Sequence, residues 1–375
     1  MKILIIGEYS GVSYNLKVGL TKLGHKVINF SEGDGWKKIP INDDDYLFNT
    51  SNYTLFEHAI KGSWRIAALF NYLNFRKVIK EYRNAFDLII IINYIFLRLP
   101  YSTFFPRFTI NNINYVSKKN AQTFMMACGD DLPYLTKAMN FRYWPHDKDN
   151  LSADIYLSTQ YLKLFFKIYN KITAVVPCMY DYAESYRLFE GIDKSKIEKT
   201  IPPAFAVNNI QHYNVINDGV IKIFHGLNRD NFKGSDIITQ ALFIIKNKYP
   251  TKVDVIINKR MPLSEYLEAI KKANIIIDQC KSYSYGMNAL YCMASGKLVM
   301  SGNELECQKE YERFDIPVVN ILPVVSDIVE KIEYYICNPQ EIIDFGIRSR
   351  KFVEEFHDPE RIAQLYLNLF NKYIL

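Results

Sequence analysis

The stretch SYSYGMNALYCMASGKLVMS (residues 282–301) decides how the rest of the chain is interpreted. Its pattern predicts a turn at 286–288, a short helix over 289–294 and an apolar strand over 298–300. The preceding segment ANIIIDQ (273–279) is typical of a buried strand. Strand, loop and helix in this order place a helix N-terminus at the carboxyl end of a strand, where free backbone N–H groups favour an anionic ligand. The sequence therefore predicts an anion site at this turn.

The length of 375 residues predicts two domains, because a chain of this size exceeds one ordinary core. The hydrophobic (49%) and charged (23%) fractions are those of a soluble globular protein. The longest apolar run, 88–97, is interrupted by Asn93 and is shorter than the ~20 residues that a membrane-spanning helix needs. No secretory signal peptide is expected, because the first residues, MKILIIGEYSG, read as a strand followed by a glycine turn.

The six cysteines are scattered along the chain and form no CxxC pair. This spacing argues against a zinc site or a disulfide framework and favours a reducing cytosol.

The first half of the chain alternates strands and helices from its start. Residues 2–6 predict an apolar strand, and a glycine turn and a helix over 14–23 lead to a second strand at 26–30. A dinucleotide site here is a weak prediction, because the turn lacks GxGxxG spacing and no acidic residue closes the second strand. The other elements predicted in this half are strands at 87–93, 121–128, 173–176 and 199–203 and a helix at 180–188.

A change of composition at 204–219 predicts the linker between two domains. After it we expect strands at 220–224, 252–257, 275–278, 298–300 and 317–320, and helices at 235–247, 263–273, 325–337, 339–355 and 360–373. Two successive α/β domains follow from this order. The predicted divisions are a first domain over 1–205, a second domain over 206–355, and a C-terminal helix within 356–375.

A second cluster of candidate residues lies in the first loop of the second domain, FHGLNRDNFKGSD (224–236). Gly226 and Gly234 allow tight turns, while Arg229 and Lys233 bring two cations beside the start of the next helix. Charge-assisted hydrogen bonds are roughly twice as strong as neutral ones, so this loop favours a diphosphate ligand. An ordinary surface role for Lys233 is the alternative.

Two carboxylates, Asp130 and Asp131, follow the predicted strand at 121–128. Ligand-binding loops of open α/β sheets lie at the carboxyl ends of strands, so these side chains are candidates for orienting a sugar acceptor or binding a metal. Capping of the following helix is the alternative. His146 lies in a polar loop (142–149) and is more typical of a surface histidine than of a catalytic one.

Residues 61–86 combine six basic side chains and one acidic side chain with apolar residues at helical spacing. One interpretation is an amphipathic helix with a solvated basic face. The other is a surface that rests on anionic lipid, which suits an enzyme with a membrane-embedded acceptor. Nucleic-acid binding is disfavoured because the stretch contains no recognised nucleic-acid-binding module.

The loop HGLNRDNFKGSD, followed about fifty residues later by SYGMNALYCMASGKLVMSG, resembles the C-terminal half of retaining GT-B-fold glycosyltransferases. More narrowly, it is similar to the bacterial group that builds surface polysaccharides from nucleotide-activated sugars. The tail GIRSRKFVEEFHDPERIAQLY (346–366) resembles the closing helices of that family, which cross back to the first domain. The resemblance covers roughly residues 220–370 and implies an α/β architecture of two Rossmann-like parallel-sheet domains that face a cleft.

The resemblance also assigns roles to individual residues. Arg229 and Lys233 would bind the donor diphosphate and stabilise it as it departs, which is the catalytic contribution expected of them. The glycine turn would approach the same phosphates and the sugar through Gly286, Met287 and Asn288. The further donor-binding candidates are Gly11, His225, Gly226, Asn228, Arg260, Tyr283 and Tyr291. Asp130 and Asp131 are the acceptor-binding candidates.

The chain departs from the family pattern at two positions. The family has a glutamate before the turn and another eight positions later, whereas this chain has Tyr283 and Tyr291. The second family glutamate holds both ribose hydroxyls, and a phenol with one oxygen and no charge cannot reproduce that bond pair. The first contacts the donor sugar, to which Tyr283 offers a weaker hydrogen bond. These differences point to another mode of ribose binding, an unusual donor or lost activity.

The resemblance implies a metal-independent, retaining hexosyltransferase that moves a sugar from a nucleotide-sugar donor to a glycan. A lipid-linked or cell-envelope acceptor, no cofactor besides the donor, and a cytoplasmic location at the inner face of the cell membrane are expected with it. One alternative is a catalytically degenerate GT-B binding subunit, suggested by the two tyrosines. The other is a GT-B sugar-nucleotide epimerase, which would need Asp130, Asp131 and His225 to face the donor.

Overall fold

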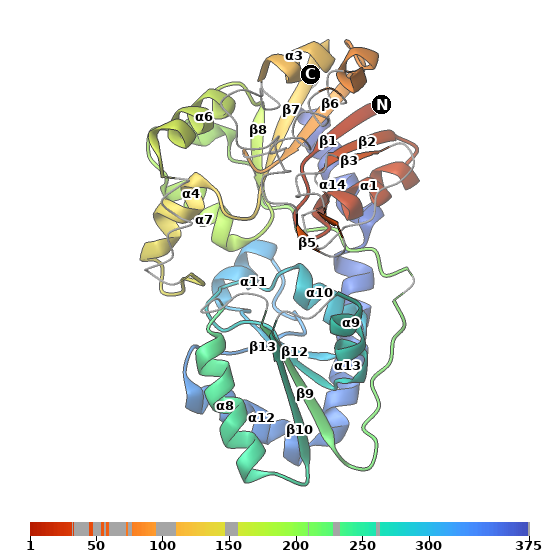
Figure 1. The fold of residues 1–375 in the computed structure, drawn as a ribbon. Helices are drawn as coiled ribbons and strands as arrows, with labels where there is room; N and C mark the ends of the chain where they lie inside the picture. Colours follow the sequence, from red (N-terminus) through yellow and green to blue (C-terminus); the bar gives the residue numbers. More distant parts are fainter. Residues whose placement is uncertain are drawn as a thin grey trace.

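The computed structural model describes residues 1–31, 33, 45–47, 54–55, 58–59, 73, 77–94, 110–146, 157–208, 210–227, 233–259 and 263–373. Within these residues the chain forms two α/β domains, each built on a parallel sheet, with one domain stacked on the other (Figure 1). A separate antiparallel pair consists of β4 (Thr54–Leu55) and β5 (His58–Ala59).

The first domain contains a six-stranded parallel sheet in the order β3-β2-β1-β6-β7-β8. Its strands are β1 (Lys2–Ile6), β2 (Lys26–Ser31), β3 (Tyr46–Leu47), β6 (Phe86–Ile92), β7 (Ser117–Ala127) and β8 (Ala174–Pro177). Its helices are α1 (Val12–Lys22), α3 (Ile110–Val116), α4 (Leu132–Lys137), α6 (Thr159–Tyr169) and α7 (Tyr180–Leu188), with short 3-10 helices at Ala138–Asn140 and Lys194–Lys196.

Both faces of this sheet are buried, so its central strands are apolar throughout. Ile3 and Ile5 of β1 pack toward α1 and the C-terminal helix, whereas Leu4 and Ile6 pack toward α3, α6 and α7. This alternation follows from the two-residue period of a strand. A strand covered on both faces needs apolar residues at every position, which explains the run FDLIIII of β6.

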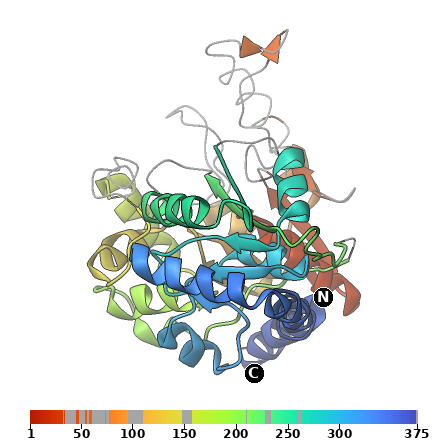
Figure 2. The ribbon, with the colours of Figure 1, turned by 90° about the horizontal axis from the view of Figure 1, so that it is seen from below.

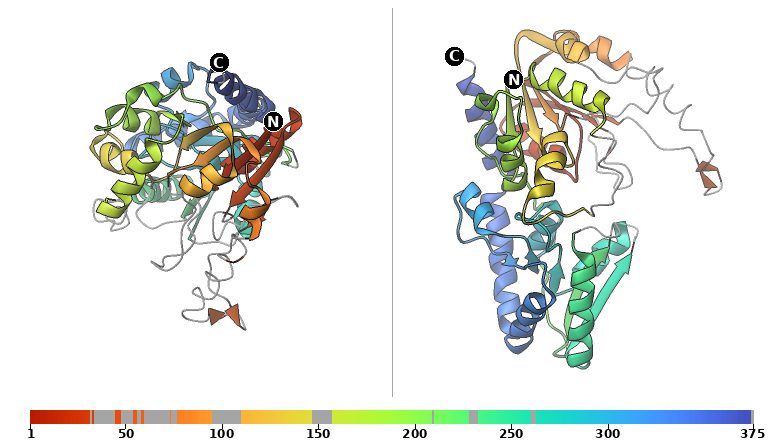
Figure 3. Two further views of the ribbon diagram at one scale, coloured as in Figure 1. Left: turned by 90° about the horizontal axis from the view of Figure 1, so that it is seen from above. Right: turned by 90° about the vertical axis from the view of Figure 1, so that its left-hand side faces the viewer.

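The second domain contains a five-stranded parallel sheet in the order β10-β9-β11-β12-β13. Its strands are β9 (Ile221–Leu227), β10 (Val253–Lys259), β11 (Ile275–Ile277), β12 (Leu298–Ser301) and β13 (Val319–Asn320). Its helices are α8 (Ser235–Lys248), α9 (Leu263–Lys272), α10 (Met287–Ala294), α11 (Leu305–Tyr311), α12 (Val325–Cys337) and α13 (Pro339–Phe356). Helices α8 and α12 cover one face of this sheet, and α9, α10 and α13 cover the other, as Figure 3 shows for α8 and α13.

The C-terminal helix α14 (Pro359–Lys372) crosses back to the first domain, as the family resemblance implies, so both chain ends lie on that domain (Figures 1 and 2). Gly19 of α1 makes this contact possible, because a Cβ there would lie 1.8 Å from the carbonyl oxygen of Pro359. Further along α14, the ring of Phe370 lies 4.5 Å from that of Phe124 on β7, measured between centroids.

Some sequence predictions differ from the structure. The strand expected at 199–203 is wrong, because Pro202 and Pro203 have no N–H group to donate to a sheet and no strand forms there. Helices α3, α6 and α11 were not predicted. Most of the basic stretch 61–86 lies outside the described residues, and its last residue, Phe86, begins β6 rather than ending a helix.

Candidate functional site

The predicted glycine turn and helix lie at the carboxyl edge of the second sheet. Helix α10 begins after Gly286, and no described side chain caps its N-terminus. A Cβ built on Gly286 would meet no atom of another described residue within 4 Å, so there is space beside the start of this helix. The N–H groups of the first turn and the helix dipole suit an anion at this position.

Lys233 extends toward the same helix end. Its Nζ lies 2.7 Å from Oδ1 of Asp278, which directly follows β11. Asn288, in the first turn of α10, donates from Nδ2 to the same oxygen at 2.8 Å. The structure thus brings the predicted cation and the predicted helix turn onto one carboxylate oxygen, although they lie far apart in the sequence. Asp278 itself was not among the predicted site residues.

The backbone of Lys233 is held on both sides. Its φ is 68°, and the following Gly234, at 79°, is the N-cap of α8. The carbonyl of Lys233 accepts from the backbone N–H of Cys280 at 3.0 Å. The N–H of Lys233 donates to the carbonyl of Pro145 at 3.1 Å, so a loop of the first domain contacts this loop of the second.

Of the other donor-site residues predicted for the second domain, His225 is buried, Gly226 is partly buried, and three lie outside the described residues. His225 is fully buried, with Nδ1 2.7 Å from the carbonyl of Ile277 and Nε2 3.0 Å from Oγ of Ser235. Burial lowers the pKa of His225, so its neutral ring donates from Nδ1 and accepts at Nε2. A Cβ on Gly226 would lie 2.5 Å from the ring of Tyr266. Asn228, Arg229 and Arg260 lie outside the described residues.

Gly11 lies at the start of α1, but its N–H group is occupied. The carboxylate of Glu8 accepts hydrogen bonds from the backbone N–H groups of Gly11 at 2.9 Å and Tyr14 at 3.0 Å. Gly11 nevertheless faces the second domain, because a Cβ built on it would lie 3.9 Å from Cε of Met287. The two helix starts therefore lie close together, one filled by a carboxylate and the other open.

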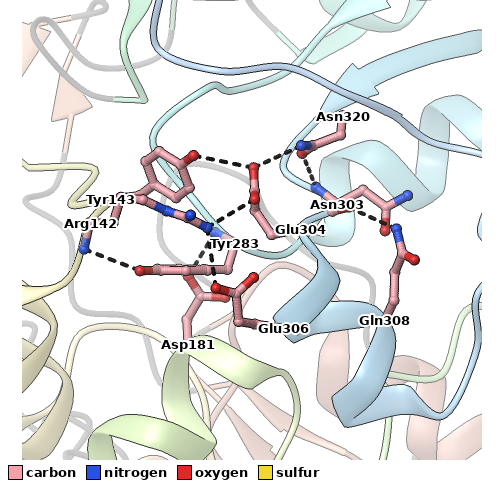
Figure 4. A network of polar contacts seen from close by, with 9 residues as sticks. All are labelled: Arg142, Tyr143, Asp181, Tyr283, Asn303, Glu304, Glu306, Gln308 and Asn320. Carbon is pink, nitrogen blue, oxygen red and sulfur yellow. Dashed lines mark hydrogen bonds and ion pairs between the residues drawn. The ribbon is translucent and has the colours of Figure 1, made fainter.

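Tyr283 joins the two domains. Its hydroxyl accepts the backbone N–H of Arg142 at 3.1 Å, and its own N–H donates to Asp181 at 3.2 Å (Figure 4). Its ring lies 5.0 Å from that of Tyr143 and 5.1 Å from that of Tyr180, between centroids. The side chain is almost completely buried. This tyrosine is thus occupied by first-domain partners.

Arg142 extends this contact, and sequence reasoning missed it. Its guanidinium lies 2.9 Å from Glu304 and 3.2 Å from Glu306, both at the start of α11 (Figure 4). It also lies 4.7 Å from the ring centroid of Tyr143 and 5.4 Å from that of Tyr283. Partners this far apart in the chain leave no local sequence signal.

Tyr291 stands on α10 and is half-buried. Its ring centroid lies 6.5 Å from that of Phe205, which precedes the second domain. Burial raises the pKa of its phenol, so the group is a neutral hydroxyl at physiological pH.

The two predicted acceptor carboxylates have different surroundings. Asp131 is fully buried and caps α4, accepting from the N–H of Tyr134 at 2.9 Å and from the hydroxyl of Tyr186 at 2.8 Å. Burial raises the pKa of Asp131 to about 7. Asp130 is more exposed, and its Oδ1 lies 3.0 Å from Nε2 of His146, which is buried rather than on the surface.

Metal clusters and membrane-spanning helices are both missing from the described part of the chain. No cluster of three or more His, Cys, Asp or Glu side chains in these residues is arranged to hold a metal ion. No helix among them has the length and apolar character that crossing a membrane requires.

No protein-family model and no curated protein matches the chain. Solved structures do match it over nearly its whole length. Sucrose-phosphate synthase from Thermosynechococcus elongatus superposes with a TM-score of 0.60 at 13% identity, covering 99% of this chain and 100% of that one. Anabaena HepE in complex with UDP and glucose gives 0.58 at 12% identity, with coverages of 99% and 100%. WaaG, a glycosyltransferase involved in lipopolysaccharide biosynthesis, gives 0.58 at 9% identity, with coverages of 97% and 99%.

These similarities extend across both domains and the returning helix, and at such low identity they define the fold. The order of two parallel sheets followed by a helix that returns to the first domain is that of the GT-B glycosyltransferases. The chain has the GT-B fold.

Proposed function

We propose that the protein is a glycosyltransferase that moves a sugar from a nucleotide-sugar donor to a glycan acceptor. The observation that carries this proposal is the position of Lys233. Its ammonium group shares one oxygen of Asp278 with Asn288, at the uncapped start of α10. A cation beside an open helix N-terminus suits a diphosphate.

The solved structures with this fold favour a nucleotide-sugar ligand. HepE has been crystallised with UDP, with UDP and glucose, and with UDP-glucose. A mutant of S. aureus TarM was crystallised with Fondaparinux, alpha-GlcNAc-glycerol and UDP. UDP is therefore the first nucleotide to test on this chain, and a hexose is the first sugar.

In the proposed reaction the donor diphosphate is the leaving group. Lys233, together with Arg229 and the first turn of α10, stabilises the negative charge that develops on it. These protein cations replace a metal ion, so the reaction is metal-independent and needs no cofactor besides the donor. No side chain is assigned as a nucleophile, and we propose transfer with retention at the anomeric carbon. Tyr291 stands where the family pattern has the ribose-binding glutamate. Because a phenol offers one neutral hydroxyl, the ribose must be held in another way than by a carboxylate.

We place the acceptor on the first domain, beside Asp130. The Asp130 carboxylate follows the carboxyl end of β7 and is paired with His146. The neighbouring residue, Pro145, contacts the loop that carries Lys233. Asp131 supports this loop by capping α4. A lipid-linked or cell-envelope glycan is the proposed acceptor, taken up by a cytoplasmic protein that rests on the inner face of the membrane through residues 61–86.

A binding subunit without catalytic activity is the second candidate. This candidate is favoured by Tyr283, whose hydroxyl accepts a hydrogen bond from the backbone N–H of Arg142. The family pattern has a sugar-binding acid at this position. An epimerase is less well supported, because the ring of His225 is enclosed by Ile277 and Ser235.

The experiment is a calorimetric titration of the protein with UDP, GDP and ADP, followed by product analysis with the matching nucleotide sugars and glycan acceptors. The proposal expects one nucleoside diphosphate to bind and its sugar to be transferred, with NMR showing the donor's anomeric configuration in the product. Binding without transfer to any acceptor would favour the binding subunit. Conversion of the donor to its epimer without an acceptor would favour the epimerase. Failure of all three nucleotides to bind would contradict the nucleotide-sugar proposal.

A further inference from the structure

Asp278 connects four elements at the carboxyl edge of the second sheet. It follows β11, and its Oδ1 accepts from Lys233 of the β9–α8 loop and from Asn288 of α10. Its Oδ2 lies 3.4 Å from Oγ of Ser301 on β12. One carboxylate thus fixes the distance between the loop that carries the predicted cation and the helix that carries the predicted turn.

The carboxylate is buried and charged. The Asp278 side chain is 2% exposed, whereas that of Lys233 is 23% exposed. Burial alone would raise the pKa of Asp278, but the Lys233 ammonium and the hydrogen bonds from Lys233 and Asn288 hold the pKa below its usual value. Asp278 is therefore ionised at neutral pH and has no open path to a ligand.

Lys233 is constrained by this partner. Removal of the ammonium would leave a buried carboxylate without its counter-ion, which is a strongly unfavourable state. An ammonium group has three N–H donors, and Asp278 takes one of them. Lys233 can therefore bind a ligand with its remaining donors while it stays on Asp278, at a place that Asp278 sets.

Asn288 completes the arrangement from the helix side. Its Nδ2 donates to Asp278, and its Oδ1 accepts from the hydroxyl of Tyr266 at 2.7 Å. Tyr266, on α9, packs on Phe224 of β9 with 5.4 Å between ring centroids. Both ends of the Asn288 amide are thus engaged within the protein, and the side chain anchors the first turn of α10 to Asp278.

We infer that Asp278 is a positioning residue of the proposed donor site, which fixes the Lys233 ammonium relative to the N-terminus of α10 without touching the ligand. This inference rests on the proposed function for the identity of the ligand, a nucleoside diphosphate. Asp278 acts through Lys233, so its effect on binding should depend on the presence of that lysine.

The test is a double-mutant cycle with Asp278→Asn, Lys233→Met and the double variant, measured by calorimetric titration with UDP, GDP and ADP. We expect Asp278→Asn to lower the affinity for the nucleotide at least about tenfold. The double variant should bind the nucleotide no more weakly than Lys233→Met alone. Additive losses, or unchanged affinity in Asp278→Asn, would overturn the positioning role.

The matched control is Asp45→Asn, which breaks another buried lysine–aspartate pair. Asp45 lies 2.6 Å from Lys17 in the first domain, and its side chain is also 2% exposed. This variant should lose stability while its nucleotide affinity changes by less than about twofold. An equal loss of affinity in Asp45→Asn would assign the effect to general loosening and would contradict the inference.

A second measurement separates this inference from the proposed function. If no nucleotide binds the wild type, the proposed ligand is wrong, and the position of Lys233 is then tested by reductive methylation with mass-spectrometric readout. Lys233 should be modified at least about threefold faster in Asp278→Asn than in the wild type, while Lys331 reacts equally in both. Equal rates at Lys233 would overturn the inference even without a ligand.

Discussion

The helices that begin at the carboxyl edges of the two sheets differ in what fills their N-termini. In the first domain, Glu8 accepts from the N–H groups at the start of α1, and Asp131 caps α4. In the second domain, α10 begins at Gly286, and no side chain caps it among the described residues. The start of α1 is thus closed by a carboxylate, whereas the start of α10, which lies near it across the domain boundary, is left open.

This difference predicts where an anion binds. A carboxylate satisfies the free N–H groups and adds a negative charge that repels phosphate, whereas a glycine leaves the groups and the helix dipole available. Lys233 reinforces the open end. We therefore expect the phosphates of a donor in the second domain and an uncharged glycan in the first.

The largest expected effect is on Lys233. Lys233→Met should weaken binding of the matching nucleoside diphosphate about 10- to 150-fold, because hydrogen bonds to a charged group contribute about 1.5–3 kcal/mol. The measurement is a calorimetric titration, with Lys17→Met as a control that removes a buried lysine from the first domain. Equal affinity in wild type and Lys233→Met would show that Lys233 does not bind the diphosphate.

Glu8 tests the closed side of the comparison. Glu8→Ala should lower the free energy of unfolding by about 1–2 kcal/mol, because the cap of α1 is lost. Nucleotide affinity should change less than about threefold, since the phosphates bind elsewhere. Urea denaturation and titration of the same preparation measure both quantities. A large loss of affinity with little loss of stability would place the phosphates at α1 instead.

Asp131 gives the closed side a pH dependence. Its folded pKa of about 7 lies above the ordinary value near 3.9, so the native state binds the extra proton between these limits. The contribution of Asp131 to stability therefore falls as pH rises from about 4 to 7, by at most about 1.4 kcal/mol per unit. Asp131→Asn should show a flatter stability profile than wild type in urea denaturation across this range. Parallel stability profiles of wild type and Asp131→Asn would contradict a raised pKa of Asp131.

Gly286 tests the open side with a smaller change. Gly286→Ala adds a methyl group where no atom of another described residue lies within 4 Å, at a φ of −112° that alanine adopts. Stability should fall by less than about 1 kcal/mol. Nucleotide affinity should fall about tenfold, because the methyl group stands in the path of the phosphates. A variant with full affinity would show that the ligand does not approach this turn.

Some elements were predicted with the bounds that the structure has. Helix α12 has its predicted bounds, and strand β1 does as well, because their apolar pattern and end signals agree. The strand expected at 199–203 was wrong because its two prolines outweigh its apolar residues. The Glu8 cap had a detectable signal, an acidic residue just before a helix start.

The candidate site was only partly predictable. Lys233 and Gly286 could be found because glycines and a basic residue precede predicted helices. Asp278 was hidden in a strand that reads as buried, and its importance appears only when β9, β11 and α10 come together. The contact of Arg142 with Glu304 joins different domains, so it depends on how the domains pack and not on any local pattern.

The most direct test of the account is a crystal structure with the nucleoside diphosphate that binds tightest. We expect phosphate oxygens within hydrogen-bonding distance of Lys233 Nζ and of the backbone N–H groups of Met287 and Asn288. Lys233 should remain on Asp278, and Glu8 should still cap α1. Phosphates bound at the start of α1, with Lys233 untouched, would contradict the assignment of the anion site to the second domain.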